Sequence, residues 1–311
     1  MSLMPGRLAG KLAKANPLSR RMAKRLTAGS ETEGALEQAA RLTGEGFHVL
    51  LHYLPDPGGE PEEQVGGHFG ALAEGMNGLA AEGLDVYVSA SLSQMGGMLS
   101  DEALERNAAR LGEHLVDRTN ASARSSKKPE EEHHCLMLET EDYDSVERTV
   151  ALRSRLARHG VPAGITLQAN LHRSIDDLRA QIAERASIRL VRGGHPQKKE
   201  ELGMSDHDEI TGNFLYLAGI LFSEDAILEG IYPVIATHQA SLIEEIESLT
   251  SRGGWPAGGY EFQFYLGLES GLQKSLLDAG HRVRVQIPFG PGWWPYVNHI
   301  LATHPKSVYR G

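Results

Sequence analysis

The sequence predicts a (β/α)8 barrel, in which eight parallel strands close into a ring and helices surround them. Short β-rich segments recur eight times along the chain, and helix-patterned segments lie between them. Each connecting helix must bury its apolar stripe against the sheet, so this alternation indicates parallel strands. Eight strand–helix units within about 250 residues have the number and size of a closed barrel. A doubly wound open sheet is the alternative because strand order cannot be derived from one sequence, but no GxGxxG motif follows the first strand.

Each predicted strand is a short run of β-branched, aromatic and aliphatic residues bounded by turn-forming or polar residues. In chain order the strands are 47–53, 85–91, 135–139, 163–168, 187–193, 231–237, 259–263 and 282–288. The helices between them have apolar residues three and four apart, and several begin at Ser or Asp and end at Gly. The clearest are 33–46, 101–117, 144–160 and 240–254. The segment ASARSSKKPEEE at 121–132 has no apolar spacing and predicts a mobile loop.

The composition excludes several classes of protein. With 311 residues, of which 41% are hydrophobic, the chain can bury a large core. Its formal charge of −10 disfavours a general nucleic-acid binder, because phosphates would be repelled. The single cysteine, Cys135, can form neither an internal disulfide nor a Cys-rich metal site, which favours a reducing compartment. No window is apolar enough to span a membrane or to serve as a signal peptide, so we expect a cytoplasmic protein.

The amino-terminal segment is basic, in contrast with the acidic remainder. We divide the chain into a basic helical extension at 1–24, a barrel domain at 25–305 and a C-terminal tail at 306–311. The simplest interpretation of the extension is a solvated amphipathic helix. The alternative is a surface that touches anionic lipid at the inner face of the membrane, or a partner protein. The basic residues at this end of the chain are Arg7, Lys11, Lys14, Arg20, Arg21, Lys24 and Arg25.

Polar side chains gather at the carboxyl ends of the predicted strands, where (β/α)8 barrels carry their active sites. The set contains no Lys, which disfavours a Schiff-base aldolase because that chemistry needs a buried amine. A metal-dependent hydrolase that uses Glu139, Glu141, His195 and His238 is an alternative. Its signal is weak because no strand carries paired ligands such as His-x-His. The strand-end residues are His52, Asp56, Ser91, Gln94, Glu139, Glu141, Gln168, Asn170, Arg189, Arg192, His195, Thr237, His238, Glu261, Gln263 and Gln286.

The segment SIRLVRGGH at 187–195 is similar to the fifth strand of the proline dehydrogenase family, whose members are flavoproteins built on a distorted (β/α)8 barrel. Seven ordered matches extend this resemblance over roughly residues 25–305, although any one of them alone would be weak. The other segments are RLTAGSETEGALEQAARLTGEGFHVLLHYL at 25–54, VSASLSQMG at 88–96, LETEDY at 138–143, GITLQANLHRS at 164–174, VIATHQ at 234–239, YEFQFYLG at 260–267 and HRVRVQIPFGPGWWPYVNHILATHP at 281–305.

This resemblance implies an FAD cofactor held by the fourth to sixth strands. In the family, the strand-five arginine contacts the flavin near its hydride-accepting nitrogen, and Arg189 stands at that position here. A guanidinium there stabilises the negative charge that develops when the flavin is reduced, and a Gly allows the backbone to approach a flat ring. The positions that the resemblance assigns to the cofactor are Gln168, Arg189, Val191, Arg192, Gly193, Thr237 and His238.

Most of the family's substrate-binding residues are replaced in this chain. The last helix of the family carries Tyr-x-x-Arg-Arg for the substrate carboxylate, whereas YVNHI keeps Tyr296 and places His299 and Ile300 at the two arginines. Tyr265 is assigned to the same pocket. The remaining replacements are Ser91 for the strand-two lysine, Glu139 for the strand-three aspartate, His195 for a strand-five tyrosine, Gln286 for the strand-eight tyrosine and Thr303 for a glutamate of the last helix.

These replacements predict an altered substrate. Each hydrogen bond to a charged group contributes roughly 1.5–3 kcal/mol, so losing two arginines and a lysine removes roughly 4–9 kcal/mol of carboxylate binding. Unless Arg173, Arg192 or a protonated His299 substitutes, we expect hydride transfer to FAD from a cyclic amine other than free L-proline, such as a modified amine or a carrier-bound prolyl group. Ordinary proline dehydrogenase activity is the first alternative, and a barrel without catalysis is another.

The resemblance also implies catalytic roles for four residues and an electron acceptor for the protein. Glu139 and Tyr296 would orient the substrate, and His195 or His299 would serve as acid or base. We expect no metal and no nucleic acid. The family passes electrons to membrane quinone, so a quinone acceptor and peripheral membrane contact through the basic extension are further expectations. The sequence leaves the oligomeric state open.

Overall fold

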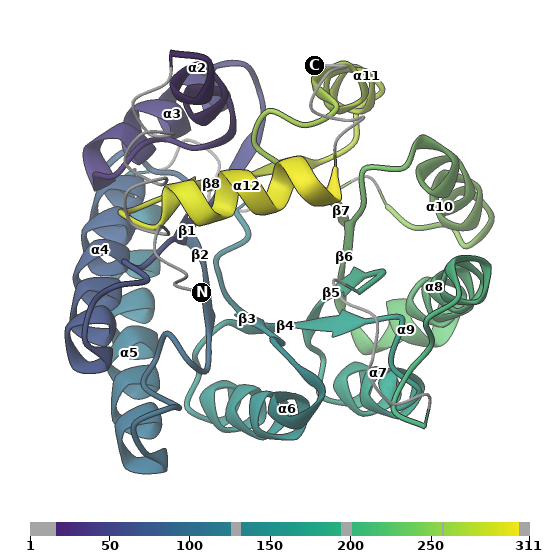
Figure 1. The fold of residues 1–311 in the computed structure, drawn as a ribbon. Helices are drawn as coiled ribbons and strands as arrows, with labels where there is room; N and C mark the ends of the chain where they lie inside the picture. The colour runs from purple at the N-terminus through teal and green to yellow at the C-terminus, as the bar shows by residue number, and fades with distance from the viewer. Residues whose placement is uncertain (1–16, 126–131, 194–200, 257, 305–311) are drawn as a thin grey trace, which may run out of the picture.

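The fold was analysed in a computed structural model, which describes residues 17–125, 132–193, 201–256 and 258–304. Eight parallel strands form a closed barrel in the order β1 to β8, and β8 pairs with β1 to complete the ring (Figure 1). The barrel predicted from the sequence is therefore confirmed. The strands are β1 His48–Tyr53, β2 Tyr87–Ser91, β3 Cys135–Glu139, β4 Ala163–Gln168, β5 Ser187–Val191, β6 Tyr232–Ala236, β7 Glu261–Tyr265 and β8 Val283–Phe289.

All eight predicted strands are present, but β7 begins two residues later than expected. Gly258 has a φ of +81°, and the backbone N–H of Gly259 donates to the carbonyl of Pro256, so a turn occupies the start of the predicted segment. The consequence is a correction for Glu261. This residue opens β7 and lies at the amino end of the barrel, opposite the end at which we placed it.

Helices surround the barrel (Figure 1), and the four that we predicted with bounds begin within one residue of the predicted positions. The predicted loop at 121–132 is wrong in its first part, because α5 continues to Ser125. Ser122 is buried there and its hydroxyl donates to the carbonyl of Leu84, which ties the last helical turn to the barrel. The helices are α2 Pro17–Leu26, α3 Thr32–Gly44, α4 Pro61–Ala81, α5 Asp101–Ser125, α6 Tyr143–Arg158, α7 Ser174–Ala183, α8 His207–Leu221, α9 Glu224–Glu229, α10 Ala240–Arg252, α11 Ser270–Asp278 and α12 Trp293–Thr303.

The last helix, α12, lies across one end of the barrel between β8 and β7 (Figure 1). It packs against α2 through a hydrophobic cluster made of Ala23, Leu26, Leu268, Val297 and Ile300. The boundary that we placed after residue 24 falls inside α2. In the chain segments that the structure describes, no helix has the length and apolarity to cross a membrane. The lipid-contact hypothesis concerns residues 1–25, of which 1–16 lie outside the described residues, and it stays a prediction.

The interior of the barrel contains a buried ionic network at its amino end. Arg284 is fully buried, and its guanidinium donates to Glu261, Asp85 and the carbonyl of Val49, each at 2.7 Å. Its carbon Cζ also lies 4.1 Å from the ring centroid of Tyr87. Burial alone would raise the pKa of Glu261, but Arg284 and the neighbouring cations lower it to about 2. This end of the barrel is therefore closed by charged groups that depend on one another.

One buried histidine outside the site predicts acid sensitivity. His68 of α4 is 2% exposed, and neither of its ring nitrogens has a hydrogen-bond partner among the described residues. Burial, followed by the nearby His52, lowers the pKa of His68 from 6.5 to about 3. Because the unfolded chain binds a proton first as the pH falls, this histidine contributes a loss of stability from pH 6.5 down to about pH 3.

We expect the His68→Leu variant to be more stable than the wild type by about 1–3 kcal/mol at pH 7, because an unsatisfied buried polar group is removed. The difference should grow by about 2 kcal/mol between pH 7 and pH 5, since each pH unit below the ordinary histidine pKa contributes about 1.36 kcal/mol. Urea denaturation at both pH values measures this difference. His159→Leu, at an exposed histidine, is the control, and a constant difference for His68→Leu would contradict the expectation.

Candidate active site

An ion pair between β3 and β5 forms the centre of the candidate site. The side chains of Glu139 and Arg189 both point into the barrel, and Nη2 of Arg189 lies 3.1 Å from Oε1 of Glu139. Two further partners fix the guanidinium: Nε donates to the hydroxyl of Thr166 at 2.9 Å, and Nη1 donates to Oε1 of Gln263 at 3.3 Å. Partners on three strands thus hold Arg189 in one orientation, and it is only 4% exposed.

The charge of Glu139 is stabilised by its neighbours. Burial would raise the pKa of this carboxyl, but Arg189 and then His52 hold it well below its usual range. Nδ1 of His52 lies 3.5 Å from Oε1 of Glu139 and 2.8 Å from the hydroxyl of Ser89. Glu139 is therefore a permanent anion balanced by Arg189, which suits it to orient a substrate and makes it a poor proton donor at neutral pH.

The residues that the resemblance assigns to the cofactor surround the ends of β4 and β5. Gln168 is buried, and its amide donates to the carbonyl and hydroxyl oxygens of Thr140, both at 3.1 Å. Gly193 has a φ of +110°, and a Cβ built on it would lie 2.0 Å from Oδ1 of Asn170. Only glycine fits this position, where the chain leaves β5. Val191 ends β5.

The guanidinium of Arg192 is directed toward the start of α8. It lies within hydrogen-bond distance of the Nε2 atom and the carbonyl oxygen of His207, both at 3.1 Å. Its Nε atom is buried and has no partner in the part of the chain that the structure describes. Arg173, a second cation that follows a strand end, is bound to Asp177 through two hydrogen bonds of 2.7 and 3.1 Å.

Aromatic side chains gather where β6 and β7 end beneath α12. The ring of His238 lies 5.2 Å from the ring of Tyr265, which in turn lies 6.4 Å from the ring of Tyr296. Burial, and then the nearby His304, lowers the pKa of His238 from 6.5 to about 3, so its imidazole is neutral at pH 7. Burial also raises the pKa of Tyr296, which keeps its hydroxyl protonated. Thr237, next to His238, is buried.

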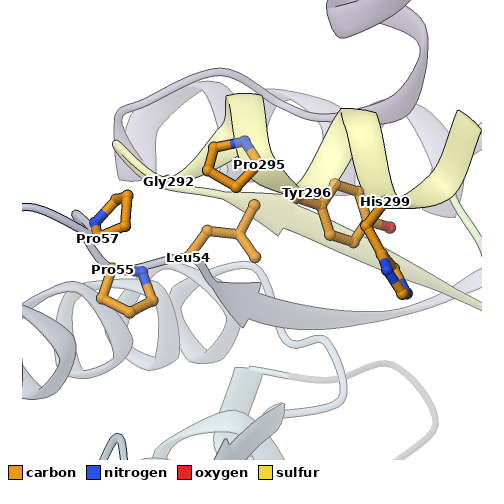
Figure 2. A pocket seen from close by; sticks show the side chains of 7 residues that line it. All are labelled: Leu54, Pro55, Pro57, Gly292, Pro295, Tyr296 and His299. Carbon is orange, nitrogen blue, oxygen red and sulfur yellow. The ribbon is translucent and has the colours of Figure 1, made fainter. Parts of the chain in front are cut away.

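A cavity of about 300 Å³ lies beside this aromatic group, between α12 and the segment that follows β1. Figure 2 shows Leu54, Pro55 and Pro57 facing the helix, and shows Tyr296 and His299 on the same side of α12. The contact between the two segments is close, because a Cβ on Gly292 would lie 2.3 Å from the carbonyl oxygen of Pro55. His299 is exposed at this cavity, whereas the hydroxyl of Tyr296 is buried.

The remaining predicted site residues lie in different parts of the structure. Ser91 is buried at the end of β2, and its hydroxyl lies 3.0 Å from that of Ser93. Gln286 is buried in β8 and is the register partner of Tyr265. Ile300 packs in the hydrophobic cluster between α12 and α2, so its side chain contributes to docking the helix. His195 lies outside the described residues.

The structure places several residues in the site whose contacts the sequence does not indicate. The sequence marks His52 only as a strand-end residue, yet His52 contacts Glu139. Thr166, which no motif indicates, holds Arg189. The available signal was strand alternation, because Thr166 and Gln168 share one face of β4. Gln263 was noted at a strand end, but nothing in the sequence indicates that it binds Arg189.

The residues of this site fit a bound flavin. Nδ1 of His238, the hydroxyl of Tyr296 and Nε of Arg192 are buried and lack hydrogen-bond partners within the described segments, and buried polar groups of this kind normally bind something. Arg189 supplies a fixed and buried positive charge at the same end of the barrel. Among the residues described, no group of three or more His, Cys, Asp or Glu is arranged to hold a metal ion.

The closed barrel, with charged and aromatic side chains at the carboxyl ends of its strands, defines the chain as a (β/α)8-barrel protein of the kind that carries an active site at that end. Residues 35–292 match the proline dehydrogenase family, and the chain belongs to that family. Its members are FAD-dependent oxidoreductases that act on a CH–NH group, and this protein is one of them.

Relatives of similar length support this assignment. The chain is 26% identical over 288 residues to proline dehydrogenase 1 of Bacillus subtilis subsp. natto, covering 92% of this chain and 88% of the relative. It is 27% identical over 291 residues to proline dehydrogenase of Deinococcus radiodurans, covering 92% and 87%.

Solved structures of longer proteins share the fold. Proline utilization A from Bdellovibrio bacteriovorus, inactivated by N-propargylglycine, superposes with a TM-score of 0.76 at 19% identity, covering 97% of this chain and 34% of the longer one. The corresponding protein of Corynebacterium freiburgense gives a TM-score of 0.74 at 18% identity and covers 100% and 35%. The chain thus spans about a third of these proteins, and at this identity the likeness shows the fold alone.

Proposed function

We propose that the protein oxidises the carbon–nitrogen bond of a cyclic secondary amine to the cyclic imine. The observation that carries this proposal is the fixed Arg189–Glu139 pair at the carboxyl end of a barrel that belongs to the proline dehydrogenase family. FAD, when bound, supplies the hydride acceptor for the carbon next to the substrate nitrogen. We assign its binding to the ends of β4, β5 and β6, with Gln168, Arg189, Gly193, Thr237 and His238 as the residues that hold it.

The residues of the chain have separable roles in this reaction. Glu139 stays anionic and would stabilise the positive charge that develops on the substrate nitrogen as the hydride leaves the neighbouring carbon. Tyr296 offers a neutral hydroxyl as a hydrogen-bond donor from α12 and helps to orient the ring of the substrate. Arg189 stabilises negative charge on the cofactor side of the site. His299 is exposed at the cavity, and we assign to it the exchange of the amine proton with solvent.

Two kinds of cyclic amine are candidate substrates. Free L-proline is supported by the names of the two relatives that cover nine-tenths of the chain. A cyclic amine without a free carboxylate, such as an esterified or carrier-bound prolyl group, is supported by the state of the cations that might replace the missing arginines. Arg173 is bound to Asp177 and Arg192 to the carbonyl oxygen of His207, so neither guanidinium can turn to a carboxylate without breaking a contact. Of the three candidates, this leaves a protonated His299, which is exposed at the cavity and supplies a less constant charge than an arginine.

Anaerobic reduction of the bound flavin distinguishes the two candidates. We expect proline methyl ester to bleach the flavin absorbance with a larger second-order rate constant than free L-proline, because no carboxylate then has to be desolvated in the site. The reverse order, with proline reacting faster by tenfold or more, would establish ordinary proline dehydrogenase activity. A preparation that contains no flavin and gains none from added FAD would contradict the proposed function itself.

A further inference from the structure

Gln263 connects the site to the ionic network at the amino end of the barrel. It occupies the middle of β7, between the inward-facing Glu261 and Tyr265, and is 3% exposed. Its Oε1 accepts a hydrogen bond from Nη1 of Arg189 at 3.3 Å, and its Nε2 donates to Oε1 of Glu261 at 2.7 Å. Nε2 also donates to the hydroxyl of Tyr87 at 3.2 Å. The amide of Gln263 therefore contacts both the Arg189–Glu139 pair and the ionic network that contains Glu261.

The chemistry of these neighbours requires a primary amide at this position. A guanidinium can only donate, so the carbonyl oxygen must face Arg189, and a carboxylate can only accept, so the amino group must face Glu261. A glutamate here would place a second carboxylate against Glu261, and a lysine would place a second cation against Arg189. A leucine would fill the space and leave both charged groups short of a partner.

The hydrogen bond between Gln263 and Arg189 helps to set the orientation of the guanidinium. Glu139 of β3 lies on one side of the guanidinium and Gln263 of β7 on the other, while Thr166 holds Nε. Without Gln263, only the Thr166 hydroxyl would oppose the pull of Glu139 on the guanidinium, and a tighter ion pair would shield its positive charge from the rest of the site. The neutral amide holds Arg189 without neutralising it.

We propose that Gln263 is a positioning residue for the redox step: it holds the Arg189 guanidinium where its charge stabilises the reduced flavin. This inference rests on the proposed function, since it takes Arg189 to lie beside the flavin. It predicts that Gln263 changes the reduction potential of the bound cofactor without touching it.

The experiment compares the reduction potential of FAD in the wild-type holoprotein and in Gln263→Leu and Gln263→Glu. We expect Gln263→Leu to lower the equilibrium constant for two-electron reduction about tenfold, which corresponds to about 30 mV. Gln263→Glu should lower it further, because the new carboxylate neutralises Arg189. Gln181→Leu is the matched control: Gln181 is also fully buried, but it lies on α7, and its replacement should leave the potential unchanged.

Different results would overturn the role of Gln263 and the proposed amine oxidation. If Arg189→Met lowers the potential and both Gln263 variants melt earlier with an unchanged potential, Gln263 is merely structural and the inference is overturned while the proposed function stands. If Arg189→Met leaves the potential unchanged, the inference is overturned because its premise is removed, while the oxidation of a cyclic amine can still stand. If the wild type binds no FAD, the proposed function itself fails. Should both Gln263 variants fail to fold, Tyr87→Phe removes only one acceptor of the Gln263 amide, and a potential equal to that of the wild type would overturn the inference.

Discussion

Replacing Arg284 by Met is expected to lower the free energy of unfolding by about 3–5 kcal/mol, because it breaks a buried ionic network from one side. Arg284 is fully buried and binds Asp85, Glu261 and the carbonyl of Val49. Without Arg284, the buried carboxylate of Glu261 keeps one arginine nearby, Arg282, whose Nε lies 3.4 Å from Oε2 of Glu261. The pKa of Glu261 therefore rises, and the native state loses stability at neutral pH. Urea denaturation at pH 7 measures the loss.

Two controls separate this effect from the removal of any arginine. Arg41 forms an exposed pair with Glu45, and Arg41→Met should change stability by less than about 0.5 kcal/mol. The double variant Arg284→Met/Glu261→Gln should recover part of the loss, because it also removes the carboxylate that Arg284→Met leaves behind. A loss below about 1 kcal/mol for Arg284→Met would show that the network contributes little.

Replacing Arg189 by Met is expected to lower kcat by about 10²–10³-fold, the effect of removing one fixed electrostatic stabiliser from an active site. The side chain keeps its length and loses its charge, so the negative charge that develops during flavin reduction is no longer balanced. The substitution also leaves Glu139 without its main partner, and we expect a lower stability together with the lower rate. Stopped-flow reduction of the flavin measures the chemical step directly.

Replacing a second buried arginine, Arg153, is the control for Arg189→Met. Arg153 is 3% exposed and binds Glu184 at 2.8 Å on the outside of the barrel. Arg153→Met should lower stability while leaving the rate of flavin reduction unchanged. The double variant Arg189→Met/Glu139→Gln should recover stability without recovering the rate. If the stable double variant instead reduces its flavin at the wild-type rate, Arg189 has no electrostatic role in the reaction.

The class of fold could be predicted from the amino-acid sequence alone. Strand segments such as 135–139 and 163–168 were predicted with the observed bounds because β-rich composition and alternation are local properties of the chain. Closure then follows from the number of strand–helix units. The place of Arg189 in the site followed from the similarity of one strand to a family, and the structure puts its side chain inside the barrel.

The contacts between side chains inside the barrel could not be predicted from the sequence. The turn at Gly258 and Gly259 delays β7 and moves Glu261 to the amino end, where it binds Arg284. Barrel closure brings alternate residues of non-adjacent strands into contact, so Arg189 reaches Glu139 on one side and Gln263 on the other. Such contacts join residues far apart in the chain, and their partners depend on strand register and barrel curvature, which no local pattern of residues encodes.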